Sequence, residues 1–153
     1  MRVLDISNKV IVHNNDETLQ LATKIGRDLK GGETIALCGP LGSGKTQIAK
    51  GIALGLGIPN ALELVTSPTF NIMQTYKKGR FPLYHWDWYR IQSASDVLEL
   101  GFNEQDQESI HLIEWAEKFQ QLCVDTTLWI YIDYSSSISE RIIQLSMEPI
   151  VSQ

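Results

Sequence analysis

Residues 39–46, with the sequence GPLGSGKT, constrain the fold more than any other stretch of this chain. They fit G-x-x-x-x-G-K-[ST], the pattern of a phosphate-binding loop. A short apolar run typical of a strand, residues 34–38, precedes them, and residues 46–56 carry their apolar side chains on one helical face. Because this is the context that the pattern requires, the sequence predicts a strand–loop–helix unit that holds phosphate.

Each residue type in that pattern has a chemical reason. Glycines let backbone N–H groups close around phosphate oxygens, and the helix N-terminus adds partial positive charge. Lys45 would reach the β- and γ-phosphates, and the Thr46 hydroxyl would ligate Mg²⁺. The alternative is a glycine-rich turn with a solvated lysine. We expect a nucleotide to contact the loop and the residue after it: Gly39, Pro40, Leu41, Gly42, Ser43, Gly44, Lys45, Thr46 and Gln47.

The bulk composition limits the function classes. A chain of 153 residues is expected to be one domain, residues 1–153. A net charge of −5 argues against a large basic surface that grips nucleic acid directly. No apolar run approaches the ~20 residues of a membrane span. The distant cysteines, Cys38 and Cys123, have no metal-site spacing and are expected to be idle thiols in a reducing cytoplasm.

Strands and helices are expected to alternate around the phosphate loop. Residues 70–76 and 82–87, joined by a four-residue turn at 77–80, predict a β-hairpin. This arrangement predicts an α/β, three-layer, P-loop NTPase-like fold with a mainly parallel central sheet, helices on both faces and antiparallel edge strands. Further strands are expected at 9–13, 34–38, 110–113, 126–134 and 141–147, and helices at 14–29, 46–56, 116–122 and from Ser93 to Gly101.

Two carboxylates follow apolar strands and complete the candidate site. Strand C-termini converge on the ligand side of an α/β sheet, so Glu114 is expected to face the region of Thr46 and Mg²⁺. Asp87 ends another apolar strand. Phosphoryl chemistry needs a carboxylate for Mg²⁺ and a group that orients the attacking water, so both acids, with Lys45, are candidate catalytic residues. The structural alternatives are a helix cap for Glu114 and, for Asp87, a hydrogen-bonding partner for Arg90 or a backbone turn.

Several other features allow two interpretations each. His85 would either shuttle protons or be a half-buried structural histidine. Trp86 and Trp88 would either pack in the core or form an exposed aromatic patch. Residues 91–117 contain seven Asp or Glu and no Lys or Arg, as expected of a solvated face or of a docking surface. Asn15 lies at the start of the first expected helix and would reach the base or sugar of a nucleotide; the alternative is a plain helix cap at Asn14 or Asn15.

Four motifs in this order resemble those of the bacterial TsaE (YjeE) family over about residues 10–145. They are residues 39–46, Ser67-Pro68-Thr69-Phe70, His85-x-Asp87-x-Tyr89-Arg90 and Ile113-Glu114-Trp115. The resemblance implies a small P-loop ATPase that binds ATP, ADP and Mg²⁺. It also implies action with the TsaB–TsaD complex in placing threonylcarbamoyl on N6 of tRNA adenosine 37. The acidic balance suggests that tRNA is reached only through these partners.

The resemblance also implies roles for single residues. Thr46 and Glu114 would be Mg²⁺ ligands, Asp87 would be essential for hydrolysis, and Trp115 would lie beside the site. Asn15 matches a nucleotide contact by position. The switch-like segment that responds to the γ-phosphate would be Ser67, Pro68, Thr69 and Phe70. The sequence departs from the family at Pro40, where an acid is usual, and at Trp86 and Trp88, where aliphatic residues or Phe are usual.

Two other function classes remain open. A small-molecule or nucleotide kinase usually carries an arginine-rich lid, and the five arginines of this chain do not cluster. A nucleotide-gated binding module without catalysis would not need Lys45, Thr46, Asp87 and Glu114 together.

Overall fold

Seven strands form one mixed sheet in the order β1-β7-β6-β2-β5-β4-β3. The computed structural model describes residues 9–104 and 107–150. The strands are β1 (Lys9–Val12), β2 (Thr34–Cys38), β3 (Met73–Tyr76), β4 (Leu83–Asp87), β5 (Ile110–Glu114), β6 (Leu128–Tyr134) and β7 (Arg141–Ser146). The helices are α1 (Asn15–Asp28), α2 (Lys45–Gly55), α3 (Ala61–Leu64) and α4 (Ala94–Glu99), with 3₁₀ segments η1 (Phe102–Glu104) and η2 (Ala116–Leu122).

The centre of the sheet is parallel and its edges are antiparallel. Strands β6, β2, β5 and β4 are neighbours in parallel pairs. Antiparallel pairs add β7 and then β1 on one side and β3 on the other. The predicted α/β class, parallel centre and antiparallel edges are therefore confirmed.

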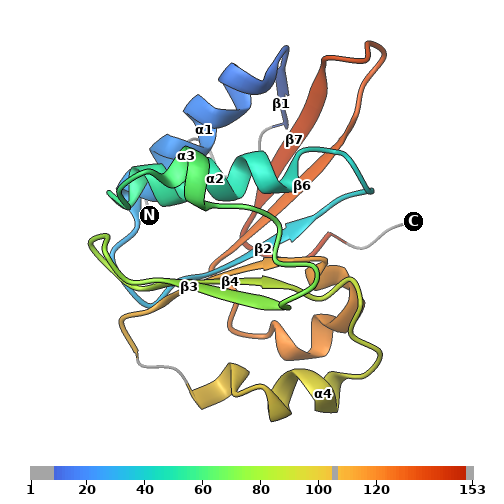
Figure 1. The fold of residues 1–153 in the computed structure, drawn as a ribbon. Coiled ribbons are helices and arrows are strands. Elements are labelled where there is room, and N and C mark those ends of the chain that lie inside the picture. The colour runs from blue at the N-terminus through green and yellow to red at the C-terminus, as the bar shows by residue number, and fades with distance from the viewer. Residues whose placement is uncertain (1–8, 105–106, 151–153) are drawn as a thin grey trace.

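Helices cover both faces of the sheet (Figure 1). Helices α1, α2 and α3 lie on one face, and α4 lies on the other with η1 and η2. Strand side chains alternate between the two layers, so Leu83 and Leu112 face α1 and α2 while Ile113 faces the opposite core. Trp86 and Trp88 are both 0% exposed in that second core. Core packing is therefore confirmed for the two tryptophans, and the exposed aromatic patch is wrong.

Helix α2, which begins at the phosphate loop, packs against α1 at very short range. Glycines stand where the two backbones approach each other. A Cβ on Gly26 would clash with the Ile52 carbonyl oxygen, and a Cβ on Gly55 would clash with the Thr23 carbonyl oxygen. This close contact fixes α2, and therefore the loop at its N-terminus, against the body of the protein.

Arg80, in the β3–β4 connection, ties the C-terminal ends of both helices together. Its guanidinium donates to the carbonyl oxygen of Gly55 at 2.7 Å and to those of Gly26, Arg27 and Leu29 at 3.0–3.2 Å. Carbonyls at a helix C-terminus have no partner within the helix, and a cation there also meets the negative end of the helix dipole.

Some expected element bounds were wrong. The hairpin strand expected at 70–76 begins at Met73, because Ile72 takes a left-handed backbone conformation with φ 67°. The expected four-residue turn is a six-residue connection, residues 77–82. Helix α3 was not predicted. The segment expected as a helix at 116–122 is 3₁₀ helix, broken at Phe119, where φ is −135°.

The two cysteines are buried free thiols, as expected. Burial raises the pKa of the Cys123 thiol to about 11, so the thiol is protonated at neutral pH. Within residues 9–104 and 107–150, no helix is long and apolar enough to span a membrane.

We predict that Arg80→Ala lowers the free energy of unfolding by about 1–2 kcal/mol, since charged donors to several helix-end carbonyls are lost but the residue is exposed. Urea unfolding followed by circular dichroism measures the change. Lys78→Ala removes an exposed charge from the same connection and should change the stability by less than about 0.5 kcal/mol. Equal stability of the two variants would contradict the capping role of Arg80.

Candidate functional site

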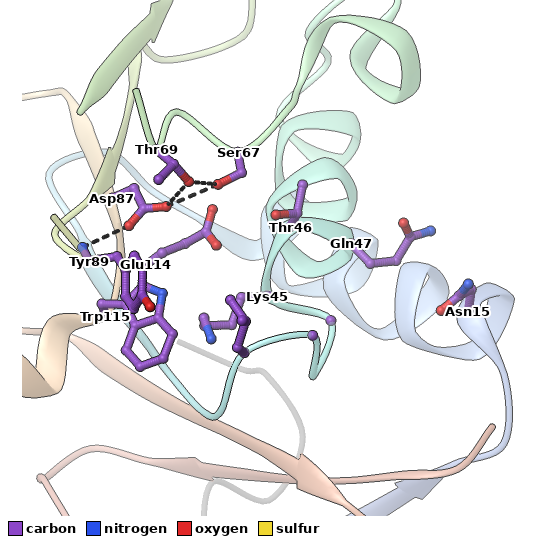
Figure 2. A pocket seen from close by; sticks show the side chains of 13 residues that line it. Asn15, Lys45, Thr46, Gln47, Ser67, Thr69, Asp87, Tyr89, Glu114 and Trp115 are labelled. Carbon is purple, nitrogen blue, oxygen red and sulfur yellow. Dashed lines mark hydrogen bonds between the residues drawn. The ribbon is translucent and has the colours of Figure 1, made fainter. Parts of the chain in front are cut away.

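A pocket of about 430 Å³ opens at the carboxyl ends of β2, β5 and β4 (Figure 2). Its lining combines the phosphate loop, the start of α1 and α2, and the ends of the two acid-bearing strands. The lining residues are Asn15, Leu41, Gly42, Gly44, Lys45, Thr46, Gln47, Ser67, Thr69, Asp87, Tyr89, Glu114 and Trp115.

Strand pairing explains why these residues meet. In the parallel β4–β5 pair, Asp87 lies directly opposite Glu114, so both carboxylates share one face of the sheet. In the β2–β5 pair, Leu37 lies opposite Glu114, so the loop after β2 begins beside the same edge. The predicted convergence of strand ends therefore follows from register alone.

The phosphate loop is held from behind by residues of the last hairpin. Arg141 Nε donates to the Ser43 carbonyl oxygen at 3.0 Å, and the Tyr134 hydroxyl donates to the Leu41 carbonyl oxygen. Gly44 ends the loop as the N-cap of α2 with φ 116°, a value that favours glycine. These contacts fix the shape of the loop through two of its backbone carbonyl oxygens.

Lys45 lies almost fully inside the protein, with 5% of the residue exposed. Its ammonium donates to the carbonyl oxygens of Gly39 at 2.6 Å and Pro40 at 3.0 Å. It also lies 4.0 Å from the ring centroid of Trp115, in cation–π contact. Among the described residues Lys45 forms no ion pair within 4.0 Å. A buried cation held only by neutral groups is suited to an anionic ligand.

Burial lowers the pKa of Lys45, and the nearby carboxylates oppose that shift. The strongest opposing charges are Glu114 and Glu117, followed by Asp87. The site therefore combines one desolvated cation with a group of acids, which is the charge pattern of a centre that binds both phosphate and a divalent metal.

Glu117 is a site residue that the sequence reasoning missed. Its Oε2 accepts a hydrogen bond from the Gly39 N–H at 3.1 Å, at the first glycine of the loop. Although the residue as a whole is exposed, burial of its carboxyl group raises its pKa. Glu117 belonged to the acidic segment that was expected to be a solvated face or a docking surface. Only its place three residues after Glu114 could have signalled this role.

Asp87 organises the segment that precedes β3. Its Oδ2 accepts hydrogen bonds from Ser67 Oγ at 3.0 Å and Thr69 Oγ1 at 2.8 Å, and its Oδ1 accepts from the Tyr89 N–H at 2.9 Å. Figure 2 shows both hydroxyls turned toward the carboxylate. The Asp87 N–H also donates to the Ile72 carbonyl oxygen at 2.8 Å. A single carboxylate thereby ties residues 67–72 to the end of β4.

Glu114 is buried and bonded to a histidine. The His85 Nε2 and Glu114 Oε2 atoms are 2.5 Å apart, and both side chains are almost fully buried. In Figure 2 the Glu114 carboxylate points into the pocket on the side of Thr46. Glu114 therefore lies beside the phosphate loop, where the sequence predicted it.

Comparisons with known proteins identify the chain. The family model described as "Threonylcarbamoyl adenosine biosynthesis protein TsaE" matches residues 12–143. The chain belongs to the TsaE family. The protein is 39% identical over 113 residues to the tRNA threonylcarbamoyladenosine biosynthesis protein TsaE of Rickettsia felis, covering 74% of this chain and 65% of that protein. It is 38% identical over 120 residues to the protein of that name from Bacillus subtilis, covering 78% and 73%.

A solved structure agrees with this assignment. The crystal structure of Bacillus subtilis YdiB superimposes with a TM-score of 0.67 and 29% identity, covering 93% of this chain and 86% of YdiB. The alignments span 65% of the Rickettsia felis relative and 62% of the Rickettsia conorii relative. The TsaE resemblance drawn from the four motifs is therefore confirmed.

The pocket of this TsaE-family chain suits Mg²⁺ by its donor chemistry. Thr46, Glu114 and Asp87 bring oxygen donors, which Mg²⁺ prefers, to one cavity. In the described ranges, no group of three or more His, Cys, Asp and Glu side chains could hold a metal ion. Mg²⁺ usually takes one or two carboxylates together with substrate phosphates and water, so two or three protein oxygens beside a phosphate loop are sufficient.

The structure also separates the roles of the two asparagines. Asn14 caps α1, since its side chain accepts from the Glu17 N–H at 2.9 Å. Asn15 instead lines the main pocket and a second cavity of about 250 Å³ behind Gly44. The cap interpretation is therefore wrong for Asn15 and confirmed for Asn14.

Not every predicted site residue lines the pocket. Gly39, Pro40 and Ser43 contribute backbone contacts to Lys45 and Arg141 instead.

In the switch-like segment, Pro68 is buried and Phe70 is 85% exposed, with its ring 4.9 Å from the Arg90 guanidinium. Arg90 therefore contacts Phe70, and Asp87 has the two hydroxyls as its partners. Tyr89 lines the pocket although it was not singled out as a binding residue.

We predict that Asp87→Ala loosens residues 66–72 in the ligand-free protein, because the two hydrogen bonds from Ser67 and Thr69 to its carboxylate are lost. Hydrogen–deuterium exchange of these amides should become roughly tenfold faster or more, given ~1.5–3 kcal/mol for a hydrogen bond to a charged group. Asp125→Ala, a change at an exposed turn, should leave the exchange unchanged. Equal exchange of this segment in the two variants would refute the role of Asp87.

Proposed function

We propose that this chain is a Mg²⁺-dependent ATPase, a single domain over residues 1–153, that acts in the cytoplasm. In this proposal it works with the TsaB–TsaD complex in the threonylcarbamoyl modification of tRNA adenosine 37. The observation that carries the proposal is the convergence of Lys45, Thr46, Asp87 and Glu114 on one pocket beside a phosphate loop. Membership of the TsaE family supports the proposed pathway, and the residues of the pocket support the proposed chemistry.

The loop would bind the β- and γ-phosphates of ATP through its backbone N–H groups and the N-terminus of α2. Within the described part of the chain, Lys45 contacts only carbonyl oxygens and the face of Trp115, so its ammonium can turn to a phosphate oxygen without breaking an ion pair there. An ammonium in a buried site stabilises negative charge on the transferring group more than it would in water.

Thr46 and Glu114 would hold Mg²⁺, which neutralises charge on the β- and γ-phosphate oxygens. Asp87 differs from Glu114, because both of its oxygens already accept hydrogen bonds. It would therefore act in hydrolysis, positioning Ser67 and Thr69 or the attacking water, more than in binding the metal. The nucleoside of ATP or ADP would extend toward Asn15, which lines the second cavity as well as the first.

The acidic net charge supports contact with tRNA through partner proteins only. Phe70 and Arg90 are exposed beside the segment tied to Asp87, so a partner bound there would touch the part of the chain nearest the γ-phosphate. Hydrolysis by the chain alone should accordingly be slow and should rise when the partner complex is present.

We predict that ATP hydrolysis by the purified chain is stimulated by TsaB–TsaD and tRNA, with no phosphorylated small-molecule acceptor formed. Phosphate release measured with and without the partners tests this, and Lys45→Ala should reduce it to background because phosphate contacts are lost. ATP binding without hydrolysis in either condition would favour a nucleotide-gated binding module. Transfer of phosphate to an added acceptor would favour a kinase.

We predict different defects for the two acids. Glu114→Ala should weaken Mg²⁺-dependent nucleotide binding by roughly tenfold or more, as loss of a metal ligand does. Asp87→Ala should leave ATP affinity nearly unchanged and stop hydrolysis. Titration calorimetry with and without Mg²⁺, together with phosphate release, separates the two effects. An equal loss of binding in both variants would be incompatible with this division of roles.

A further inference from the structure

His85 contacts Glu114 from within the core. The histidine is 0% exposed and lies two residues before Asp87 on β4, so its side chain points to the same face of the sheet as the two acids. Its direct neighbours are Leu112 on β5 and Gln74 on β3, and Leu83 precedes it on that face, so apolar side chains lie on two sides of the ring. A polar ring in such a place needs a reason other than filling space.

The hydrogen bond to Glu114 gives that reason. His85 Nε2 and Glu114 Oε2 are 2.5 Å apart. An ionised carboxylate only accepts hydrogen bonds, so with Glu114 in that form His85 Nε2 is the donor. Within the described residues, His85 Nδ1 is buried and has no hydrogen-bond partner. Leaving a buried polar atom unsatisfied costs roughly 1–3 kcal/mol. The ring position therefore favours the hydrogen bond between Nε2 and Glu114, while the unsatisfied Nδ1 lowers the stability of the fold.

Glu114 and Asp87 stand directly opposite each other on neighbouring strands, where like charges repel. Asp87 is held in place by Ser67, Thr69 and the Tyr89 N–H. Among the described residues, the Glu114 carboxylate receives only the hydrogen bond from His85. That bond engages Oε2 and leaves Oε1 for a ligand in the pocket.

We propose that His85 is a positioning residue for the proposed metal site. By donating to Oε2 it fixes the rotamer of Glu114 so that Oε1 is presented beside Thr46, where Mg²⁺ would bind. The inference rests on the proposed function for the identity of the metal. The fixed rotamer itself can be tested without nucleotide or metal.

A second buried histidine provides a matched control. His111 lies on the opposite face of β5, stacks on Tyr84 with ring centroids 5.3 Å apart, and accepts a hydrogen bond from Trp86 Nε1 at 3.1 Å. It packs in the second core, away from the pocket lining. His111→Leu should therefore lower stability without altering Glu114.

Three substitutions at His85 distinguish the effect of its hydrogen-bond donor on Glu114 from the effect of its packing in the core. His85→Gln keeps a donor near the place of Nε2. His85→Asn places its donor near Nδ1, where no partner lies. His85→Leu keeps about the same volume in apolar surroundings and removes the donor. Thermal unfolding of each variant identifies any general loss of fold.

The first readout is the crystal structure of each variant without nucleotide. We expect the Glu114 carboxylate to keep its position in His85→Gln and in His111→Leu, and to turn away in His85→Asn and His85→Leu. An unchanged Glu114 in His85→Leu would overturn the proposal, whether or not the protein binds ATP.

The second readout is the Mg²⁺ concentration that half-saturates the Mg²⁺-dependent part of nucleotide binding. It should rise roughly 10- to 100-fold in His85→Asn and His85→Leu, as for other residues that orient metal ligands, and stay near the wild-type value in His85→Gln and His111→Leu. Nucleotide affinity in EDTA should be alike in all variants. Equal Mg²⁺ dependence in His85→Gln and His85→Leu would refute the role of His85. Absence of Mg²⁺-dependent binding in the wild type would instead refute the proposed function.

Discussion

Parallel pairing of β2, β5 and β4 is the constraint on which the site depends. Once β5 lies between the other two strands, the loop after β2, the acid that ends β5 and the acid that ends β4 must share one edge of the sheet. A shift of one residue in either pair would send a carboxylate to the opposite core. The apolar residues that fill both faces therefore set the register of the strands, and the register determines which acidic side chains reach the pocket.

Each of three buried charged side chains of the site, Lys45, Asp87 and Glu114, has a specific partner. Glu114 is bonded to His85, Asp87 to two hydroxyls and a backbone N–H, and Lys45 to loop carbonyls and an aromatic face. Burial of an unpaired charge would cost several kcal/mol. Since Lys45 is the one cation among these three side chains, it is the charge that gains most from an anionic ligand.

Sequence reasoning predicted the features that local chemistry determines. The loop pattern, the apolar strands and the acids at their ends gave the pocket and most of its lining. Contacts between distant segments were not predictable: Arg80 reaches the end of α1, more than fifty residues away, and Glu117 reaches back 78 residues to Gly39. The pairing of β1 with β7 at the far edge is likewise non-local. Periodicity reports which face of an element is buried and carries no information on which partner buries it.

The backbone shows why residues 70–72 were misread as strand. Ile72 has high strand propensity, yet it adopts φ 67°, a conformation that a β-branched residue takes only when its surroundings impose it. Such a conformation costs on the order of 1–3 kcal/mol. The hydrogen bonds from Ile72 N–H to Pro68 and from Asp87 N–H to Ile72 offset that cost. Trp115, which lines the pocket, is strained in the same way at φ 62°. Two strained residues thus lie on segments beside one site. A ligand or partner contact can most easily change the conformation of these segments, because relief of the strain would offset part of the free-energy cost of the rearrangement.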